Sequence, residues 1–297
     1  MSDLFVAPAT EEALPACFAL LPMLADPDAI VFAARDGEGS LAGAAGLTWR
    51  SWNSPPGFPV WVHVLPDRRR QGLGRALLAE LIRQSEGELD QLWAAQPIAE
   101  ASDAAAFARA CGFKPERRQL FFEADARTFL TQIARTVDLL RRRGRVPEEA
   151  KLVRIDQVAI DDLAHLIASE FRTAPPRLLE MLRRSVASEP SRAPIDRLQS
   201  RVLLMDGQVA GALLSRRTGE NSAHIVCNVV APAWRKGWAN AALLDGFTRG
   251  TVEAGCTRIG FDCGEDVHDT IGLAARSEAD HIRTDAWFGY ALSATER

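Results

Sequence analysis

The residues best suited to chemistry in this chain are the arginines and glycines of Val62–Leu78, VHVLPDRRRQGLGRALL. A strand-like run ends at Pro66, and helical spacing of apolar residues begins shortly afterwards. Glycines lack a Cβ, so the backbone between these elements can turn tightly and approach a ligand closely. The first N–H groups of a helix have no internal partner and favour an anion. Positive charge surrounds them, on Arg68, Arg69, Arg70 and Arg75. The junction therefore predicts a cradle for phosphate or pyrophosphate.

Two common phosphate motifs are excluded at this junction. No Gly-Lys-Ser/Thr follows, so it is not a P-loop, and the dinucleotide fingerprint GxGxxG is incomplete. The pattern V-x-V-x-P-x-x-R-x-x-G-x-G-x-x-L-L instead resembles the acetyl-CoA-binding motif of the GNAT N-acetyltransferases. FARACGF at 107–113 is similar to that family's LYEKLGF, and the order of predicted elements over 1–123 agrees.

The resemblance implies a binding mode for coenzyme A. In GNAT enzymes the loop binds the pyrophosphate through backbone amides, and the preceding strand hydrogen-bonds the pantetheine arm. The strand residues implied are Val62, His63 and Val64. The loop residues implied are Arg69, Arg70, Gln71, Gly72, Leu73, Gly74 and Arg75.

The elements that must position this loop follow from hydrophobic periodicity. Strands are expected at 4–9, 60–65, 91–95 and 117–124, with a hairpin over 29–49. Helical spacing covers 11–24, 75–85 and 103–111. The fold class expected is α/β with a mixed central sheet.

The second half repeats this order. Strands are expected at 151–155, 224–230, 258–262 and 286–292, a hairpin at 201–216, and helices at 161–171, 239–254 and 269–279. A repeat this long indicates two copies of one domain. We therefore expect two tandem GNAT folds, at 1–125 and 151–297, joined by a helix-like linker at 126–150. The layout resembles tandem GNAT acyltransferases such as mycothiol synthase.

The second copy of the loop, VVAPAWRKGWANAALL at 229–244, is disturbed. An ungapped alignment matches Arg235 to Arg69 but places Trp238 and Asn240 where the two glycines stand. A shift by one residue recovers Gly237 and Ala239 but loses the arginine. We expect a weakened or lost coenzyme site here.

The proton-transfer groups usual in the family are missing from the first copy. By the resemblance, the glutamate position falls near Ala95 and the tyrosine position at Ala108. His63 is a candidate base through water, or a packed histidine on the other face of its strand. Asp262 occupies the base position of the second copy, or is a strand-end carboxylate. Positioning alone can also supply much of the rate.

Tryptophans suggest where an acceptor binds. Trp49, Trp52 and Trp61 lie around the loop before the coenzyme strand, where they line an acceptor groove or belong to the core. Trp287 and Tyr290 are candidates for one wall of that groove, supplied by the second domain.

Composition narrows the remaining classes. A net charge of −4 predicts no nucleic-acid partner, and runs such as Arg141–Arg143 are interpreted as a solvated helix face. Five scattered cysteines without a CxxC pair predict neither disulfides nor a metal site, and favour a reducing compartment, the cytoplasm. The sequence has no window of 18 uninterrupted apolar residues, so no membrane span is predicted.

The expected function is acetyl-CoA-dependent N-acetylation of a small-molecule or peptide amine, with the coenzyme in the first domain. Two alternatives stay open. One is a non-catalytic acyl-CoA-binding or regulatory protein, suggested by the missing acid and base. The other is an acyltransferase that uses a different acyl donor.

Overall fold

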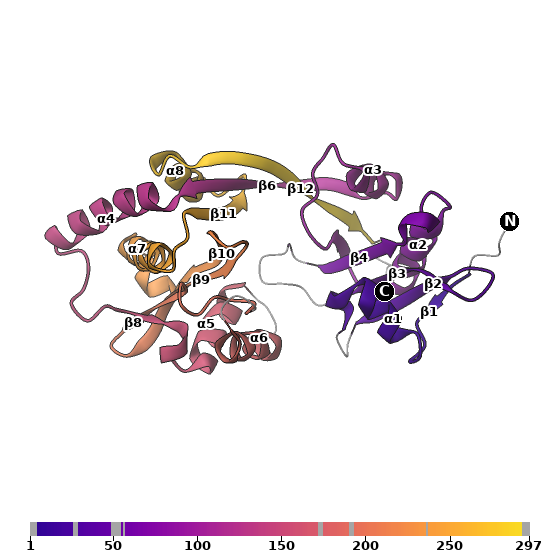
Figure 1. The fold of residues 1–297 in the computed structure, drawn as a ribbon, viewed down its shortest axis with the longest axis horizontal. Coiled ribbons are helices and arrows are strands. Elements are labelled where there is room, and N and C mark those ends of the chain that lie inside the picture. The colour runs from indigo at the N-terminus through magenta and orange to yellow at the C-terminus, as the bar shows by residue number, and fades with distance from the viewer. Residues whose placement is uncertain are drawn as a thin grey trace. The chain divides into compact units, whose positions relative to one another are not determined.

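The structure, a computed structural model, describes residues 5–25, 29–48, 55, 57–171, 175–189, 193–235 and 237–292. The chain forms two compact units. The first consists of residues 1–119 and 285–297, and the second of 120–284. The trace of each unit can be followed by colour in Figure 1.

The first unit is a sheet in the order β1-β2-β3-β4-β5-β12-β6, with β6 and β12 contributing only their portions within this unit. All described pairings are antiparallel except β4 with β5, which is parallel. The strands are β1 (Phe5–Pro8), β2 (Ile30–Arg35), β3 (Leu41–Leu47), β4 (Phe58–Val64), β5 (Gln91–Ala94), β6 (Lys114–Asp125) and β12 (Asp280–Ala291). The helices are α1 (Leu14–Leu20), α2 (Leu73–Ser85) and α3 (Asp103–Ala110), with short 3-10 turns at Pro22–Leu24 and Pro66–Arg68.

The second unit repeats this topology. Its sheet order is β12-β6-β11-β10-β9-β8-β7, again antiparallel except for the parallel pair β10 and β11. The further strands are β7 (Lys151–Arg154), β8 (Arg201–Met205), β9 (Gln208–Arg217), β10 (Ser222–Val230) and β11 (Arg258–Gly264). The helices are α4 (Ala126–Arg142), α5 (Ile160–Phe171), α6 (Pro175–Ala187), α7 (Trp238–Glu253) and α8 (His268–Arg276), with 3-10 turns at Ile155–Gln157 and Pro232–Trp234.

The C-terminal strand belongs to the sheet of the first unit. Residues 289–291 of β12 pair with β5, and Ile98 bridges to Ala286. Correspondingly, the end of β6 lies in the second unit, where Glu123 pairs with Arg258 of β11. The bounds of these compact units therefore differ from those of the consecutive domains 1–125 and 151–297. The division into those two domains stays a prediction. Trp287 and Tyr290, expected to come from the second domain, lie in the first unit.

Helix α4, in the segment expected to be a helix-like linker, packs in the core of the second unit. Asp125 caps it by accepting a hydrogen bond from the Thr128 amide, at 2.8 Å. Its buried residues Phe129, Ile133 and Val137 join the cluster formed by α7, β8 and β11. Their spacing of four residues places them on one helix face, which explains why this face is apolar.

Candidate coenzyme and acyl-transfer site

The junction between β4 and α2 forms the predicted anion cradle. Arg70 and Gly72 both have left-handed backbones, with φ of +63° and +87°, and Gly72 is the N-cap of α2. The amide groups of Gln71 to Arg75 donate no backbone hydrogen bond within the described part of the chain. Successive free amides at a helix N-terminus attract an anion. The geometry therefore has the donors that a pyrophosphate needs.

The arginines at the junction have different roles. Arg68 pairs with Asp36 at 2.8 Å, and the Asp36 side chain is only 5% exposed and also accepts the Glu38 and Ser40 amides. Arg69 Nε donates to the Val64 carbonyl at 3.1 Å, which ties the loop to the end of β4.

The remaining arginines are closer to what an anion needs. Arg70 is exposed and forms no ion pair with a described residue. Arg75 interacts with Cys111, where burial raises the pKa of the thiol and the arginine's charge partly offsets that rise. Arg70 is therefore the cation best placed to meet a phosphate.

The second glycine of the loop serves helix packing. A Cβ on Gly74 would lie 3.2 Å from the Phe107 ring of α3 and 3.6 Å from the Val64 side chain. A Cβ on Gly72 would meet nothing within 4 Å, so Gly72 is required by its backbone conformation instead. The two glycines thus allow α2 both to begin sharply and to approach α3 closely.

A cavity opens where β4 and β5 part. Their ladder ends at Val60 opposite Ala94, with a last hydrogen bond from the Ala95 amide to the Val60 carbonyl at 3.1 Å. Beyond it, the edge of β4 up to Val64 has no ladder with β5. The cavity measures about 360 Å³, which lies within the range of small-molecule sites. It is lined by Val60, Trp61, Val62, Leu78, Ala94, Ala95, Gln96, Pro97, Ile98, Ala99, Ser102, Ala104, Phe107, Ala108 and Phe113.

The predicted strand residues divide between the two faces of β4. Val62 lines the cavity, and both Val62 and Val64 pack against the core beneath α2. His63 points to the opposite face, half-buried and opposite Ala44 of β3, and does not line the cavity. Its assignment as a base stays a prediction.

The predicted acceptor aromatics fall into three groups. Trp61 lines the cavity and donates to the Thr48 hydroxyl at 3.3 Å. Trp49 and Trp52 lie outside the described residues. Trp287 is buried and donates to Gln119 at 3.3 Å, while Tyr290 packs on Phe113 with ring centroids 5.2 Å apart. These last two are part of the first unit's sheet and core.

Comparison with known proteins places this geometry in a family. Residues 27–115 match the family model described as "Acetyltransferase (GNAT) domain". The chain carries a GNAT domain. The match includes β2 to α3, and hence both the loop and the cavity. The recognition of this family and of a GNAT-type acyltransferase is therefore confirmed.

Solved structures extend the likeness in fold to nearly the whole chain. A tandem GNAT protein from the clavulanic acid biosynthesis pathway is 20% identical, with a TM-score of 0.60 over 97% of this chain and 98% of that one. A GCN5-related N-acetyltransferase from Sphaerobacter thermophilus is 16% identical, with a TM-score of 0.55 over 97% and 95%. One from Anabaena variabilis ATCC 29413 is 12% identical, with a TM-score of 0.60 over 98% and 73%. No curated protein sequence matches the chain. The tandem GNAT fold is confirmed.

The loop between β10 and α7 in the second unit has a feature of each of the two alignments considered for it. Arg235 Nε donates to the Val230 carbonyl at 2.9 Å, as Arg69 does to Val64. Gly237 is the N-cap of α7 with φ of +83°, as Gly72 is for α2. One residue therefore separates the arginine from the glycine, whereas two do so in the first loop.

Trp238 does not occupy the anion's place. Its side chain is 4% exposed and packs in the core edge-on to Trp234, at 6.4 Å between centroids. The ungapped alignment, which matches Trp238 to Gly72, therefore does not place the indole in the anion's space, and the weakened or lost coenzyme site stays a prediction. The differences that remain are the shorter loop and an ion pair between Arg235 and Glu170 of α5, which neutralises the charge an anion would meet.

Asp262 is paired across its strands. It lies on β11 and its Oδ1 is 2.6 Å from Nε2 of His224 on β10, with both side chains about one-fifth exposed. His224 pairs with Gly260 at the last position of the β10–β11 ladder. The carboxylate is therefore part of a histidine–aspartate pair in the second unit, and its assignment as a base stays a prediction.

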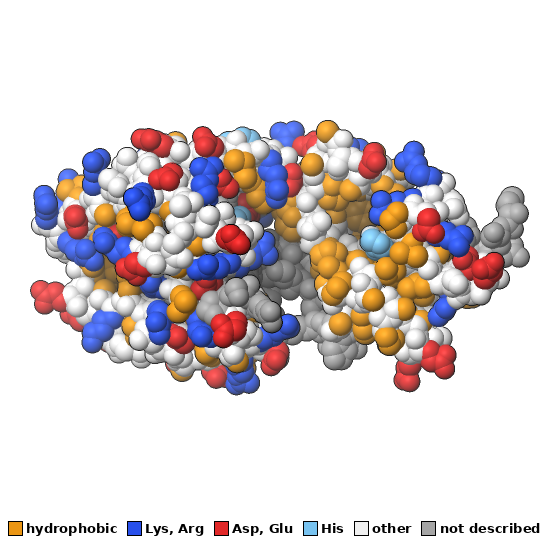
Figure 2. Space-filling model, in the orientation of Figure 1, with side chains coloured by type: hydrophobic (Ala, Val, Ile, Leu, Met, Phe, Trp, Pro, Cys, Tyr) orange, Lys and Arg blue, Asp and Glu red, His pale blue; other side chains and the backbone are white. Residues whose placement is uncertain are grey.

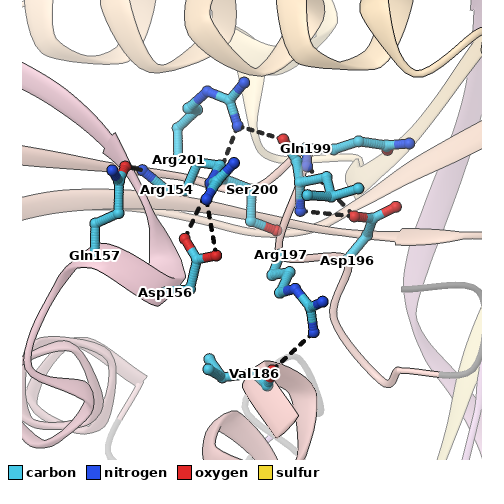
Figure 3. A network of polar contacts seen from close by, with 10 residues as sticks. Arg154, Asp156, Gln157, Val186, Asp196, Arg197, Gln199, Ser200 and Arg201 are labelled. Atoms are coloured by element: carbon cyan, nitrogen blue, oxygen red, sulfur yellow. Dashed lines mark hydrogen bonds and ion pairs between the residues drawn. The ribbon is translucent and has the colours of Figure 1, made fainter. Parts of the chain in front are cut away.

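Other polar clusters in the second unit are structural. In the network of Figure 3, the fully buried Asp196 accepts the Leu198 amide at 2.8 Å. Asp196 also accepts a hydrogen bond from Arg217 Nε at 3.1 Å. Arg201 donates to the Leu198 and Ser200 carbonyls. These bonds fix the segment before β8. Over the same unit, the face seen in Figure 2 mixes positive and negative side chains.

Within the described ranges, no group of three or more His, Cys, Asp or Glu side chains is placed to hold a metal ion. No helix of this part of the chain has the length and apolar character to cross a membrane. None of the five cysteines is in a disulfide with a described residue.

Proposed function

We propose that this GNAT protein transfers an acyl group from coenzyme A to the amine of a small molecule or peptide, with the coenzyme bound in the first unit. The family match supports acyl-CoA-dependent N-acyltransferase activity. The observation that carries the finer assignment is the row of free amides from Gln71 to Arg75, next to an unpaired strand edge that leads into a cavity.

Different residues of the first unit would bind different parts of coenzyme A. The amides and Arg70 would bind the pyrophosphate, as charge-assisted donors. The free edge of β4 from Val64 towards Val60 spans about 13 Å and would hydrogen-bond the pantetheine arm. The thioester would then lie at the cavity mouth near Val62.

Catalysis in this arrangement would depend mainly on positioning. None of the residues described as lining the cavity has a titratable side chain. The nitrogen of a neutral amine attacks the thioester carbonyl, the C–N bond forms, the C–S bond breaks, and the amine's proton passes to the departing thiolate. Holding the reactants in line can supply much of such a barrier. The free cysteines are consistent with the cytoplasm, which we include in the proposal.

The same lack of an acid and base favours a second candidate, a non-catalytic acyl-CoA sensor. Calorimetry with coenzyme A and acetyl-CoA tests binding first, and release of coenzyme thiol over a panel of amines tests turnover. We expect binding, with Arg70→Ala weakening it and Arg127→Ala, at an exposed residue of α4, leaving it unchanged. Binding without turnover on any amine would favour the sensor. No binding of either ligand to the wild-type chain would refute both.

A further inference from the structure

The cavity beside β4 is apolar where an acyl group would end. The positions near Ala95 and at Ala108 both have methyl side chains, and Ala108 is 7% exposed at the cavity wall. Ile98 and Phe113 also line the cavity. Alanine at these two positions leaves space that a glutamate and a tyrosine would fill, and an apolar wall favours an apolar occupant.

Two of the three polar side chains around the cavity are already bonded elsewhere. Ser102 donates to the Ala99 carbonyl at 2.7 Å and accepts the Ala105 amide at 3.2 Å as the cap of α3. The Trp61 indole donates to Thr48. Gln96 is exposed. A charged or hydroxylated acceptor placed against this apolar wall would lose its water and meet few side-chain partners, which is costly. A hydrocarbon chain meets no such cost.

We propose that the cavity holds the acyl chain of a donor longer than acetyl-CoA, of about butyryl to hexanoyl length. This inference rests on the proposed function, because the thioester must lie at the cavity mouth near Val62 for its chain to enter. The bonds exchanged are the same: the longer acyl group leaves the coenzyme sulfur for the amine nitrogen, and coenzyme A departs as the thiol.

The effect should be large enough to measure. Burying one methylene contributes about 0.8 kcal/mol, or about fourfold in affinity. Hexanoyl has four methylenes more than acetyl, so full burial corresponds to at most about two-hundredfold tighter binding. We expect at least a tenfold increase from acetyl- to hexanoyl-CoA.

The experiment compares coenzyme A, acetyl-, butyryl- and hexanoyl-CoA by calorimetry on the full chain. Ala108→Leu fills the cavity, and Ala106→Leu is the matched control, because Ala106 lies on the same helix but is exposed. We expect Ala108→Leu to remove most of the chain-length dependence, so that hexanoyl-CoA binds that variant no more than about threefold more tightly than acetyl-CoA does. Ala106→Leu should retain the wild-type series. Thermal unfolding checks that both variants are folded.

Three outcomes would overturn the proposal. Coenzyme A and acetyl-CoA could bind while the longer donors bind no tighter, which leaves the proposed function intact. The chain-length dependence could persist in Ala108→Leu. Ala108→Leu could instead raise the KM for the amine alone, which would make the cavity an acceptor site. Failure of coenzyme A itself to bind would contradict the proposed function as well. This result therefore differs from the three above, in which coenzyme A still binds.

Discussion

Replacing Gly72 with alanine should weaken coenzyme A binding more than it weakens the fold. Gly72 has φ of +87°, and an alanine there costs about 1–2 kcal/mol of folding free energy. A Cβ at this position meets no atom within 4 Å, so no clash adds to that cost. If the loop relaxes to relieve the strain, at least one charge-assisted amide bond to the pyrophosphate is lost, about 1.5–3 kcal/mol, or roughly ten- to hundredfold in Kd.

The second unit provides a matched control for this change. Gly237 has φ of +83°, is the N-cap of α7, and would also have no neighbour within 4 Å of a Cβ. Gly237→Ala should therefore lose a similar stability in denaturant titration but leave coenzyme A affinity unchanged in calorimetry. Equal loss of affinity in both variants would refute the assignment of the coenzyme to the first unit. Unchanged affinity in Gly72→Ala would refute the role of the loop amides.

Three further predictions test the fold and the chemistry. Asp36→Ala should destabilise the chain by about 2 kcal/mol or more, because its bonds to Arg68 and to two amides are lost; Asp67→Ala, at an exposed partner of the same arginine, should cost under about 0.5 kcal/mol in the same denaturant titration. Burial raises the pKa of the Cys227 thiol to about 12, so the unfolded chain, with a thiol pKa near 8.5, ionises first. The stability that comes from burying the neutral thiol is fully present below about pH 8.5 and is lost as the pH rises towards 12. The difference in unfolding free energy between wild type and Cys227→Ala should therefore narrow over that window. Parallel plots of unfolding free energy against pH for the two proteins would contradict this prediction. His63→Ala should lower kcat/KM by less than about tenfold, since His63 does not line the cavity, whereas a hundredfold loss with coenzyme binding intact would identify it as the base.

Local patterns predicted most elements of this fold because they follow from side-chain periodicity. The turn at Asp206 and Gly207 joins β8 to β9 as expected, with both residues at positive φ. The glycine loop of the first unit also has the conformation that its residue types require. Helix α6 was not expected, although its apolar residues share one face, because no strand-to-helix pattern preceded it.

The neighbour that each strand pairs with could not be predicted from the sequence. The run 286–292 reads as a strand in either sheet, since a strand's pattern fixes its faces but not its neighbour. The cavity was equally hidden, because it depends on where the β4–β5 ladder stops at Val60. The alanines near 95 and at 108 indicated missing proton-transfer groups, and only their position in space shows that they also leave room.

The exchange of β12 has a consequence for how the chain is made. The sheet of the first unit needs residues 285–291 between β5 and β6, but these are synthesised after the whole second unit. At 5–20 residues per second, the ribosome takes roughly 10–30 s to pass from residue 120 to residue 291. During that interval the edge of β5 has no neighbour on the β12 side and is open to mispairing with other nascent chains. Synthesis of residues 285–291 therefore completes the sheet of the first unit, and a chain that stops before residue 285 would leave that sheet unfinished.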